Sequence, residues 1–285
     1  MNYQIITDSC CDLTQEQLQS LQVTCVNLTL LYNGENHNNF SDPTAVKAFY
    51  DELRNGTRAT TAAVNPDGWA EQMKPALEAG QDVLVMAFSS GLSTTYQSAV
   101  IAAKELQEVY PDRKIYVVDT LCAALGQGLL VQYASRKRAA GMPIEELVAW
   151  LEEHKLNLCH WVTVDDLSHL KRGGRISATT ALVGSMMNIK PIIHVDNDGH
   201  LINCAKVRGR KTAMEYLVKK LGETCTDFDT VFIAHGDCPE DAATLEAMIR
   251  EKHNVQEITT GYVGPVIGAH TGPGVLVVFF LGTHR

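Results

Sequence analysis

The sequence contains no apolar stretch long enough to cross a membrane. Its longest apolar run, residues 275–281, falls far short of the roughly 20 residues that a membrane-spanning helix needs, so we predict a buried strand there. The first residues of the chain have neither the basic region nor the apolar core of a signal peptide, because Asp8 and Ser9 interrupt them. We therefore expect a cytoplasmic protein with no stable insertion into a membrane.

Paired metal or redox cysteines are also missing. None of the 8 cysteines belongs to a Cys-x-x-Cys pair, and a chain of 285 residues does not need disulfide bonds to be stable. His235 and Cys238 have the spacing of two metal ligands, but no second pair lies nearby in the sequence. These absences predict reduced thiols and no metal site.

Two further absences concern anionic ligands. The 24 basic residues are outnumbered by 33 acidic ones, and the resulting formal charge of −9 opposes binding to nucleic acid. The pattern Gly-x-x-x-x-Gly-Lys-Ser/Thr does not occur, nor does Gly-x-Gly-x-x-Gly after a strand, so the sequence predicts no nucleotide cofactor. Any anion must bind at a local site.

What is present is the alternation typical of an α/β protein. Short apolar runs and amphipathic stretches follow one another at residues 3–7, 14–21, 23–32, 83–88, 93–108 and 114–118. This βαβ rhythm predicts a parallel sheet in the first part of the chain. Two helices have clear starts, at Asp42-Pro43 and Asn65-Pro66, where a capping residue precedes proline.

The second part of the chain has a different pattern. An almost continuous helical region, residues 123–155, is broken only at one Gly-Met-Pro sequence, and we place the domain boundary just beyond it. Residues 191–195 and 200–207 flank a turn-forming cluster and predict an antiparallel hairpin. The expected fold class is α/β with two domains: a parallel-sheet βαβ domain at 1–158 and an α+β domain with an antiparallel or mixed sheet at 159–285.

Hydroxyl side chains gather in three segments of the first domain: Asp8-Ser9, Thr60-Thr61 and residues 89–95. Each segment follows a strand or precedes a helix. Loops at the carboxyl ends of parallel strands line the ligand crevice of such sheets, and helix N-termini there attract anions. Any one segment could simply cap a helix, but the run of hydroxyls within residues 89–95 favours an anion site.

Two glycine-containing segments of the second domain are candidates for the other side of that site. Residues 165–177 predict a helix that ends at two glycines, with Ser177 as the next N-cap. Residues 264–274 are dense in glycine, which indicates that the backbone closely approaches another group, and they contain His270. A lone histidine is more often structural than functional, although one here could donate to an anion.

Together these segments resemble the DegV family. The resemblance covers the whole chain in the family's order and is carried by Asp8-Ser9, Thr61 ahead of Asn65-Pro66, and residues 89–99, 170–176, 190–192 and 264–274. It implies a fatty-acid carrier of two α/β domains, with the carboxylate between them and the acyl tail in the second domain. Some members are the binding subunit of bacterial fatty-acid kinase. They present the acid to a separate ATP-binding subunit, and an acyltransferase consumes the acyl phosphate.

The resemblance also implies site residues by position in these motifs. It implies that the carboxylate is bound by Thr61 and Ser93, assisted by His270 and Arg172 from the second domain and by Ser90 and Thr94. The sequence departs from the family pattern at Ala62, where serine is usual, and at Thr94, where glycine is usual. Ala62 lacks a donor and Thr94 adds bulk beside the head group, so the preferred acid can differ from that of other members.

Burial of the acyl tail would supply most of the affinity. A tail of about 14 methylenes at roughly 0.8 kcal/mol each contributes on the order of 11 kcal/mol before ordering costs. Donors at Thr61, Ser93 and His270 mainly cancel the cost of burying the carboxylate and fix its orientation. Residues 182–189 are a candidate wall because their two methionines adapt to an alkyl chain, although methionines fill an ordinary core equally well.

A serine hydrolase is the alternative function. Ser93 as nucleophile, His270 as base and Asp8 or Asp119 as orienting carboxylate are the residue types that such an enzyme needs. Against it, the sequence around Ser93 lacks the second glycine of a nucleophile elbow.

One basic cluster is unusual in so acidic a chain. Lys206, Arg208, Arg210 and Lys211 lie at a strand end and the following helix start, where cations face an unfavourable helix dipole. We expect them to dock the kinase or the acyltransferase. A solvated face or a structural ion pair would explain the same residues.

Overall fold

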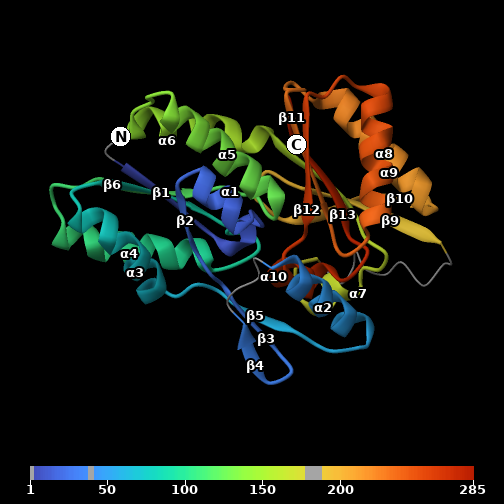
Figure 1. Ribbon diagram of the computed structural model, residues 1–285, viewed down its shortest axis with the longest axis horizontal. Helices are drawn as coiled ribbons and strands as arrows, with labels where there is room; N and C mark the ends of the chain where they lie inside the picture. Colours follow the sequence, from blue (N-terminus) through green and yellow to red (C-terminus); the bar gives the residue numbers. More distant parts are fainter. Residues whose placement is uncertain (1–2, 38–41, 177–187) are drawn as a thin grey trace.

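The computed structural model of the protein describes residues 3–37, 42–176 and 188–285 (Figure 1). Two large sheets lie side by side, with a small third sheet beside them. Mixed α/β architecture with a separate parallel sheet and a mixed sheet confirms the expected fold class.

The N-terminal sheet is parallel throughout, in the order β2-β1-β6-β7. Its strands are β1 (Tyr3–Asp8), β2 (Val23–Val26), β6 (Asp82–Ala87) and β7 (Ile115–Asp119). Both faces are covered, because successive side chains such as Ile5 and Ile6 are fully buried in different apolar clusters. The carboxyl ends of β1, β6 and β7 therefore form one edge from which loops emerge.

Helices pack on the two faces of this sheet. One cluster joins it to α3 (Pro66–Glu78) and α4 (Thr95–Val109), and another joins it to α1 (Gln15–Ser20), α5 (Leu125–Ala139) and α6 (Ile144–His154). The predicted start of α3 is confirmed, since Asn65 Oδ1 accepts a hydrogen bond from Gly68 N. The start of α2 (Pro43–Arg54) is confirmed in the same way by Asp42.

The C-terminal sheet is mixed, in the order β10-β9-β8-β13-β11-β12. Its strands are β8 (Leu158–Thr163), β9 (Ile189–Val195), β10 (Leu201–Arg208), β11 (Thr230–His235), β12 (Glu257–Tyr262) and β13 (Leu276–Leu281). The predicted hairpin is the antiparallel pair β9 and β10, and only β11 and β12 run parallel within this sheet as described. Helices α8 (Arg210–Thr224) and α9 (Pro239–Lys252) cover one face.

The opposite face of the C-terminal sheet packs toward the N-terminal half. Val162, Ile193 and Phe279 from this face share an apolar cluster with Leu84 and Leu129 of the N-terminal half. The two halves are therefore joined by a common core. Strand β8 begins at Leu158, and a division of the chain at residues 1–158 and 159–285 stays a prediction.

Sequence reasoning missed the small sheet. Residues 23–32 form two strands in different sheets: β2, and β3 (Thr29–Tyr32), which pairs with β4 (Glu35–His37) and β5 (Thr60–Ala62). Four short helical segments complete the described chain: η1 (Ser9–Cys11), η2 (Lys155–Asn157), which precedes β8, α7 (Ser168–Arg172) and α10 (Pro265–Thr271).

Candidate functional site

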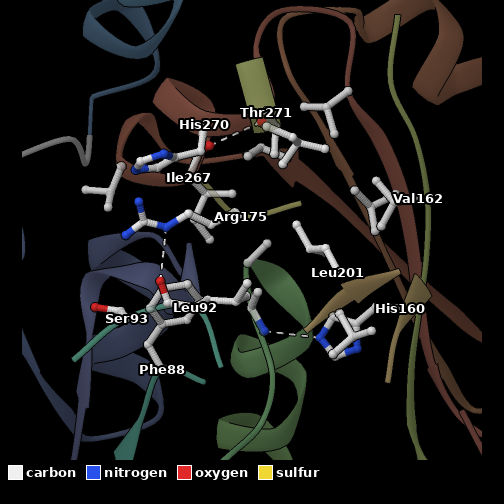
Figure 2. A pocket seen from close by; sticks show the side chains of 18 of the residues that line it. Phe88, Leu92, Ser93, His160, Val162, Arg175, Leu201, Ile267, His270 and Thr271 are labelled. Carbon is white, nitrogen blue, oxygen red and sulfur yellow. Dashed lines mark hydrogen bonds between the residues drawn. The ribbon is translucent and has the colours of Figure 1, made fainter. Parts of the chain in front are cut away.

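A cavity of about 450 Å³ lies between the two halves. Its lining is mostly apolar and comes from the N-terminal half (Leu28, Thr61, Ala63, Phe88, Ser90, Leu92, Ser93, Thr94, Ala123, Ala124) and the C-terminal half (His160, Val162, Leu170, Arg175, Ile193, Val195, Leu201, Val263, Val266, Ile267, His270, Thr271, Val275, Val277, Phe279). Figure 2 shows Ser93, Arg175 and His270 at one end and His160 and Val162 at the other. The cavity thus has a polar end and an apolar end, and both halves contribute to it.

The polar end contains a contact between the two halves. Oγ1 of Thr61, on β5, lies 2.8 Å from Nε2 of His270, on α10. Thr61 is placed by the antiparallel pairing of β5 with β3, in which it opposes Leu30. This arrangement brings together the predicted residues Thr61 and His270.

His270 is kept uncharged by its surroundings. Burial, assisted by the nearby Arg175 cation, lowers the pKa of its imidazole to about 4. Room for the ring comes partly from Gly173, where a Cβ atom would lie 2.3 Å from Nδ1 of His270. A neutral imidazole can either accept a hydrogen bond from Thr61 or donate one to an anion.

The remaining predicted hydroxyls lie on the loop that follows β6, residues 88–94, which we call the head loop. Ser93 and Ser90 line the cavity, as does Thr94, the exposed residue that immediately precedes α4. Oγ of Ser93 lies 2.8 Å from Oγ1 of Thr95 and accepts a hydrogen bond from Thr95 N at 3.2 Å. The Ser93 hydroxyl is therefore held at the N-terminal end of α4.

Asp8 fixes the base of the head loop, a role that sequence reasoning did not assign. Its Oδ2 accepts a 2.7 Å hydrogen bond from Phe88 N, and its Oδ1 accepts one from Cys10 N at 3.0 Å. Burial nevertheless raises the pKa of the Asp8 carboxyl to about 6, with these hydrogen bonds acting in the opposite direction. Asp8 therefore positions the loop and lies behind the cavity.

The structure places Arg175, and not Arg172, in the cavity wall. Arg172 is exposed, and its Nη2 atom lies 2.9 Å from Nδ1 of His169. Gly174 has a φ of 69°, which turns the chain back after α7 so that Arg175 N reaches Leu170 O at 3.0 Å. The Arg175 side chain then crosses to the head loop, where its Nε donates to Leu92 O at 3.1 Å.

At the apolar end, His160 is a second residue that sequence reasoning missed. It is 2% exposed, and burial lowers the pKa of its imidazole to about 3. Its Nε2 accepts a hydrogen bond from Ala123 N at 3.2 Å, so Nδ1 carries the proton and donates to Leu158 O at 3.1 Å. With both nitrogens occupied by backbone groups, this histidine is a neutral wall residue.

The glycine-dense segment, residues 264–274, packs closely against side chains of the N-terminal half. Most of it forms the helix α10. A Cβ atom on Gly268 would lie 2.6 Å from the Tyr50 hydroxyl, which donates to Val263 O at 2.7 Å. A Cβ atom on Gly264 would lie 2.3 Å from Oδ1 of Asp12. Glycine lets residues of the N-terminal half pack tightly around the helix that carries His270.

The described hydrogen bonds do not assemble a catalytic triad. Ser93 pairs with Thr95, and His270 pairs with Thr61. Asp8 accepts from backbone N–H groups, and Asp119 does the same with Ser90 N and Leu121 N. Geometry gives the hydrolase alternative no support.

The basic cluster is divided by the structure. Nε of Arg210 donates to Oδ2 of Asp241 at 2.8 Å, so Arg210 forms a structural ion pair. Lys206 and Arg208 are exposed on β10, and Lys211 is exposed at the start of α8. These three cations are the part of the cluster that can meet a partner.

The remaining expectations concern membrane-spanning helices, a metal site and residues outside the described ranges. Among the helices of residues 3–37, 42–176 and 188–285, none combines the length and apolar character that crossing a bilayer requires. Within the same ranges, no three His, Cys, Asp or Glu side chains group closely enough to hold a metal ion. The predicted cap Ser177 and both methionines of the candidate wall lie outside the described residues.

Comparison with known proteins gives a consistent result over the full chain. Residues 2–283 match the family described as uncharacterised protein, DegV family. A DegV domain-containing protein of Clostridium perfringens, CPE0026, is 46% identical over 98% of this chain and 97% of its own length. The DegV domain-containing protein YteA of Lactococcus lactis is 35% identical over the same shares.

Solved structures agree with the sequence comparisons. A structure from Thermotoga maritima, described as a DegV lipid-binding protein, covers all of both chains with a TM-score of 0.87 and 28% identity. A DegV family protein from Thermus thermophilus, described by its fatty-acid binding, has a TM-score of 0.87 and 29% identity over 98% of this chain and 99% of its own. The Bacillus subtilis protein DegV, described as a fatty-acid-binding protein, has a TM-score of 0.84 and 27% identity over 98% of both chains.

Proposed function

The chain belongs to the DegV family, whose members bind fatty acids, and from this premise we propose that it binds a long-chain fatty acid in the cavity between its halves. The observation that carries the proposal is the distribution of polarity in that cavity. Ser93, Arg175 and His270 lie at one end (Figure 2), where Thr61 contacts His270, whereas the rest of the lining is mainly apolar. A molecule with one anionic end and an alkyl chain matches this pattern.

The two ends have different roles in this proposal. Each buried methylene contributes roughly 0.8 kcal/mol, so the tail supplies the affinity. At the other end, the Arg175 guanidinium and the Ser93 and Thr61 hydroxyls compensate the carboxylate for lost water, and His270 completes the set. The carboxylate lies at the junction of the halves, and the walls around the tail come from both.

We propose further that the protein presents the bound acid to a separate ATP-binding kinase subunit and that an acyltransferase consumes the acyl phosphate. The polar end supports this role because its donors can bind a carboxylate, and among the described hydrogen bonds the Thr61–His270 pair has no acidic third member that would complete a catalytic triad. The protein would then be a carrier in the cytoplasm, with the fatty acid as its ligand and catalysis in its partner.

The proposal is tested by extraction of the purified protein. We expect organic solvent to release long-chain fatty acid in about a 1:1 ratio to protein, because an apolar cavity of this kind is more stable when filled. Delipidated protein should show a higher melting temperature when oleic or palmitic acid is added. Failure of both measurements would contradict fatty-acid binding.

A further inference from the structure

A second cavity, of about 600 Å³, shares the wall residue Val266 with the cavity that Ser93 and His270 line. We call it the junction cavity. Its lining comes from residues 9–18 around η1 and α1, from the start of α2, and from β12 and the first turn of α10. Sites for small molecules typically have volumes of about 300–1,000 Å³. The protein therefore has room for a second small ligand where its two halves meet.

His235 supplies a hydrogen-bond donor to the junction cavity. It is the last residue of β11, lines the cavity and is 6% exposed. Its Nδ1 accepts a hydrogen bond from Cys238 N at 3.3 Å, and burial lowers the pKa of the imidazole. The ring is therefore neutral, with the proton on Nε2, and this N–H has no hydrogen-bond partner among the described residues. Because a buried donor without a partner is costly, Nε2 marks a position for an acceptor atom of a ligand.

The lining of the junction cavity disfavours ions. Among the described residues, no lysine or arginine lines it, so an anion would have no counter-charge there. Asp12 lines the cavity, and both its carboxylate oxygens are buried. Burial raises the pKa of the Asp12 carboxyl well above its ordinary range, with the nearby Gly264 N–H acting in the opposite direction and Asp8 adding to the rise. A cation therefore gains little from Asp12, because the carboxyl favours its neutral form.

Uncharged polar side chains provide the remaining contacts. Gln15, Asn27 and Thr259 line the cavity, and none of them forms a side-chain hydrogen bond within the described chain. The rings of His235 and Tyr262 add a flat surface, with their centroids 4.6 Å apart and their planes tilted by 52°. A purely apolar ligand would leave the polar groups without partners, whereas a neutral ring that carries hydroxyl groups can satisfy both kinds of surface.

We propose that the junction cavity is a second binding site, for a small neutral molecule with several hydroxyl groups on a ring, and that His235 Nε2 donates to this ligand. A sugar and the ribose of a nucleoside share this chemistry. Binding at this site does not depend on a fatty acid being present.

The helix α10 links the junction cavity to the proposed fatty-acid site. Val266 lines both cavities, and His270, one turn later on the same helix, contacts Thr61. A ligand in either cavity holds α10 in place, so the second ligand meets a wall that is already fixed. Each ligand should therefore strengthen the binding of the other. This linkage rests on the proposed fatty-acid binding.

Calorimetry on the full chain tests the site with matched probes. We expect methyl β-glucoside or adenosine to bind with a Kd below about 1 mM, and the tighter of the two identifies the source of the hydroxyl groups. Glucose 6-phosphate and AMP add a phosphate to the same groups and should bind at least about tenfold more weakly, because the cavity lacks cations. Absence of binding by both neutral probes would overturn the proposal, as would equal binding of a neutral probe and its phosphate.

Variants of the lining locate the bound probe. His235→Asn keeps an acceptor near the position of Nδ1 but removes the donor at Nε2, so it should weaken the neutral probe about fivefold. His235→Gln places an amide near the position of Nε2 and should recover most of that loss. His200→Asn makes the same change at an exposed turn outside the lining and is the matched control.

Thr259→Val keeps the test decisive if changes at His235 prevent folding. It removes a hydroxyl at nearly constant volume and should weaken the probe about threefold. A probe that binds the folded His235→Asn and Thr259→Val proteins as tightly as wild type lies elsewhere, which would exclude the junction cavity as its site.

The linkage is measured by the same titration on delipidated and on palmitate-loaded protein. We expect the probe to bind about fivefold more tightly to the loaded form, and palmitate to gain the same factor when the probe is saturating, because linkage is reciprocal. Equal affinities in the two forms would rule out the linkage while the second site stood. Failure of palmitate to bind would overturn the proposed function, whereas the probe titration on delipidated protein would still decide whether the second site exists.

Discussion

His270 Nε2 lies 2.8 Å from Thr61 Oγ1, so an imidazole of the C-terminal half and a hydroxyl of the N-terminal half meet at the polar end of the cavity. The imidazole has a pKa of about 4 because it is buried and lies near Arg175. A carboxylate placed beside it would favour the imidazolium and raise that pKa again. Binding of an acid there would therefore be coupled to uptake of a proton.

We predict that fatty-acid binding takes up a fraction of a proton near pH 6 and much less near pH 8. At the higher pH the imidazole stays neutral whether or not ligand is present, so the difference disappears. Calorimetry in buffers of different ionisation enthalpy measures the uptake. His270→Gln keeps a donor but cannot titrate, and an identical proton count in this variant would show that another group is responsible.

The two arginines near α7 should have different effects on binding. Arg175 lines the cavity and donates to Leu92 O, whereas Arg172 is exposed beside His169. We expect Arg175→Gln to weaken palmitate binding by about tenfold or more, because it removes a charged donor from the cavity lining. Arg172→Gln is the matched control and should stay within about twofold. Equal losses would mean that general surface charge, not a direct contact, attracts the acid.

Thr61 and Ser93 should affect orientation more than affinity. Loss of one hydroxyl donor to a charged group costs about 1–3 kcal/mol, which is small beside the burial of the tail. Thr61→Val and Ser93→Ala should therefore retain bound lipid, while acyl-phosphate formation with the kinase falls much further because the carboxylate is misaligned. Thr61→Ser keeps the hydroxyl and should preserve both. Parallel losses of binding and turnover would contradict a role in orientation.

The helix starts were predictable from the sequence because their cause is local. Asp42 and Asn65 each supply an oxygen to the first turn of the helix that follows. Strand β8 was not predictable by the same means, since all its residues are buried and its pattern therefore lacks the alternation of a half-exposed strand. Its burial is decided by β9 and β13, which come later in the chain.

The site shows the same division between local and distant causes. The resemblance to the DegV family named Thr61 and His270, and the structure places them in contact. The resemblance implied Arg172, whereas the structure places Arg175 in the cavity wall. Which of the two arginines reaches the cavity depends on how Gly174 turns the chain after α7. His160 belongs to none of the motifs recognised in the sequence. Its place in the cavity depends on a contact with Ala123, which lies in the other half of the chain.

Asp8 should make stability depend on pH in an unusual direction. Its folded pKa of about 6 lies above its ordinary value of 3.8, so the folded state favours the protonated carboxyl. The resulting contribution is greatest below about pH 4 and is lost as the pH rises through 6, by about 3 kcal/mol in total. His270 acts in the opposite sense, because its pKa is lowered and its neutral burial destabilises the fold as the pH falls from 6.5 towards 4.

Single variants separate these contributions. We predict that Asp8→Asn removes this contribution, so the difference in free energy of unfolding between wild type and variant should change by about 2 kcal/mol between roughly pH 4.5 and pH 7. Urea denaturation at the two pH values measures the difference. Glu71→Gln neutralises an exposed carboxylate and serves as the control. A pH-independent difference for Asp8→Asn would mean that the carboxyl titrates normally in the folded protein.

The exposed cations of the basic cluster carry the prediction about a partner. Lys206, Arg208 and Lys211 are exposed, whereas Arg210 is engaged by Asp241, so substitution of Arg210 would disturb the fold and obscure any effect on docking. In a chain with a net charge of −9, an exposed group of cations would steer an acidic partner toward this surface. Charges at the rim of an interface act mainly on the association rate and its salt dependence.

We therefore predict that Lys206→Glu combined with Arg208→Glu leaves lipid content unchanged but slows kinase-coupled acyl-phosphate formation by about tenfold at low salt. The deficit should shrink at high salt, because screening weakens the attraction in wild type and the repulsion in the variant. Lys74→Glu combined with Lys104→Glu makes the same charge change on exposed positions of the N-terminal half and should have little effect. If both pairs slow the reaction equally, net charge is responsible. If neither does, the kinase approaches through another face.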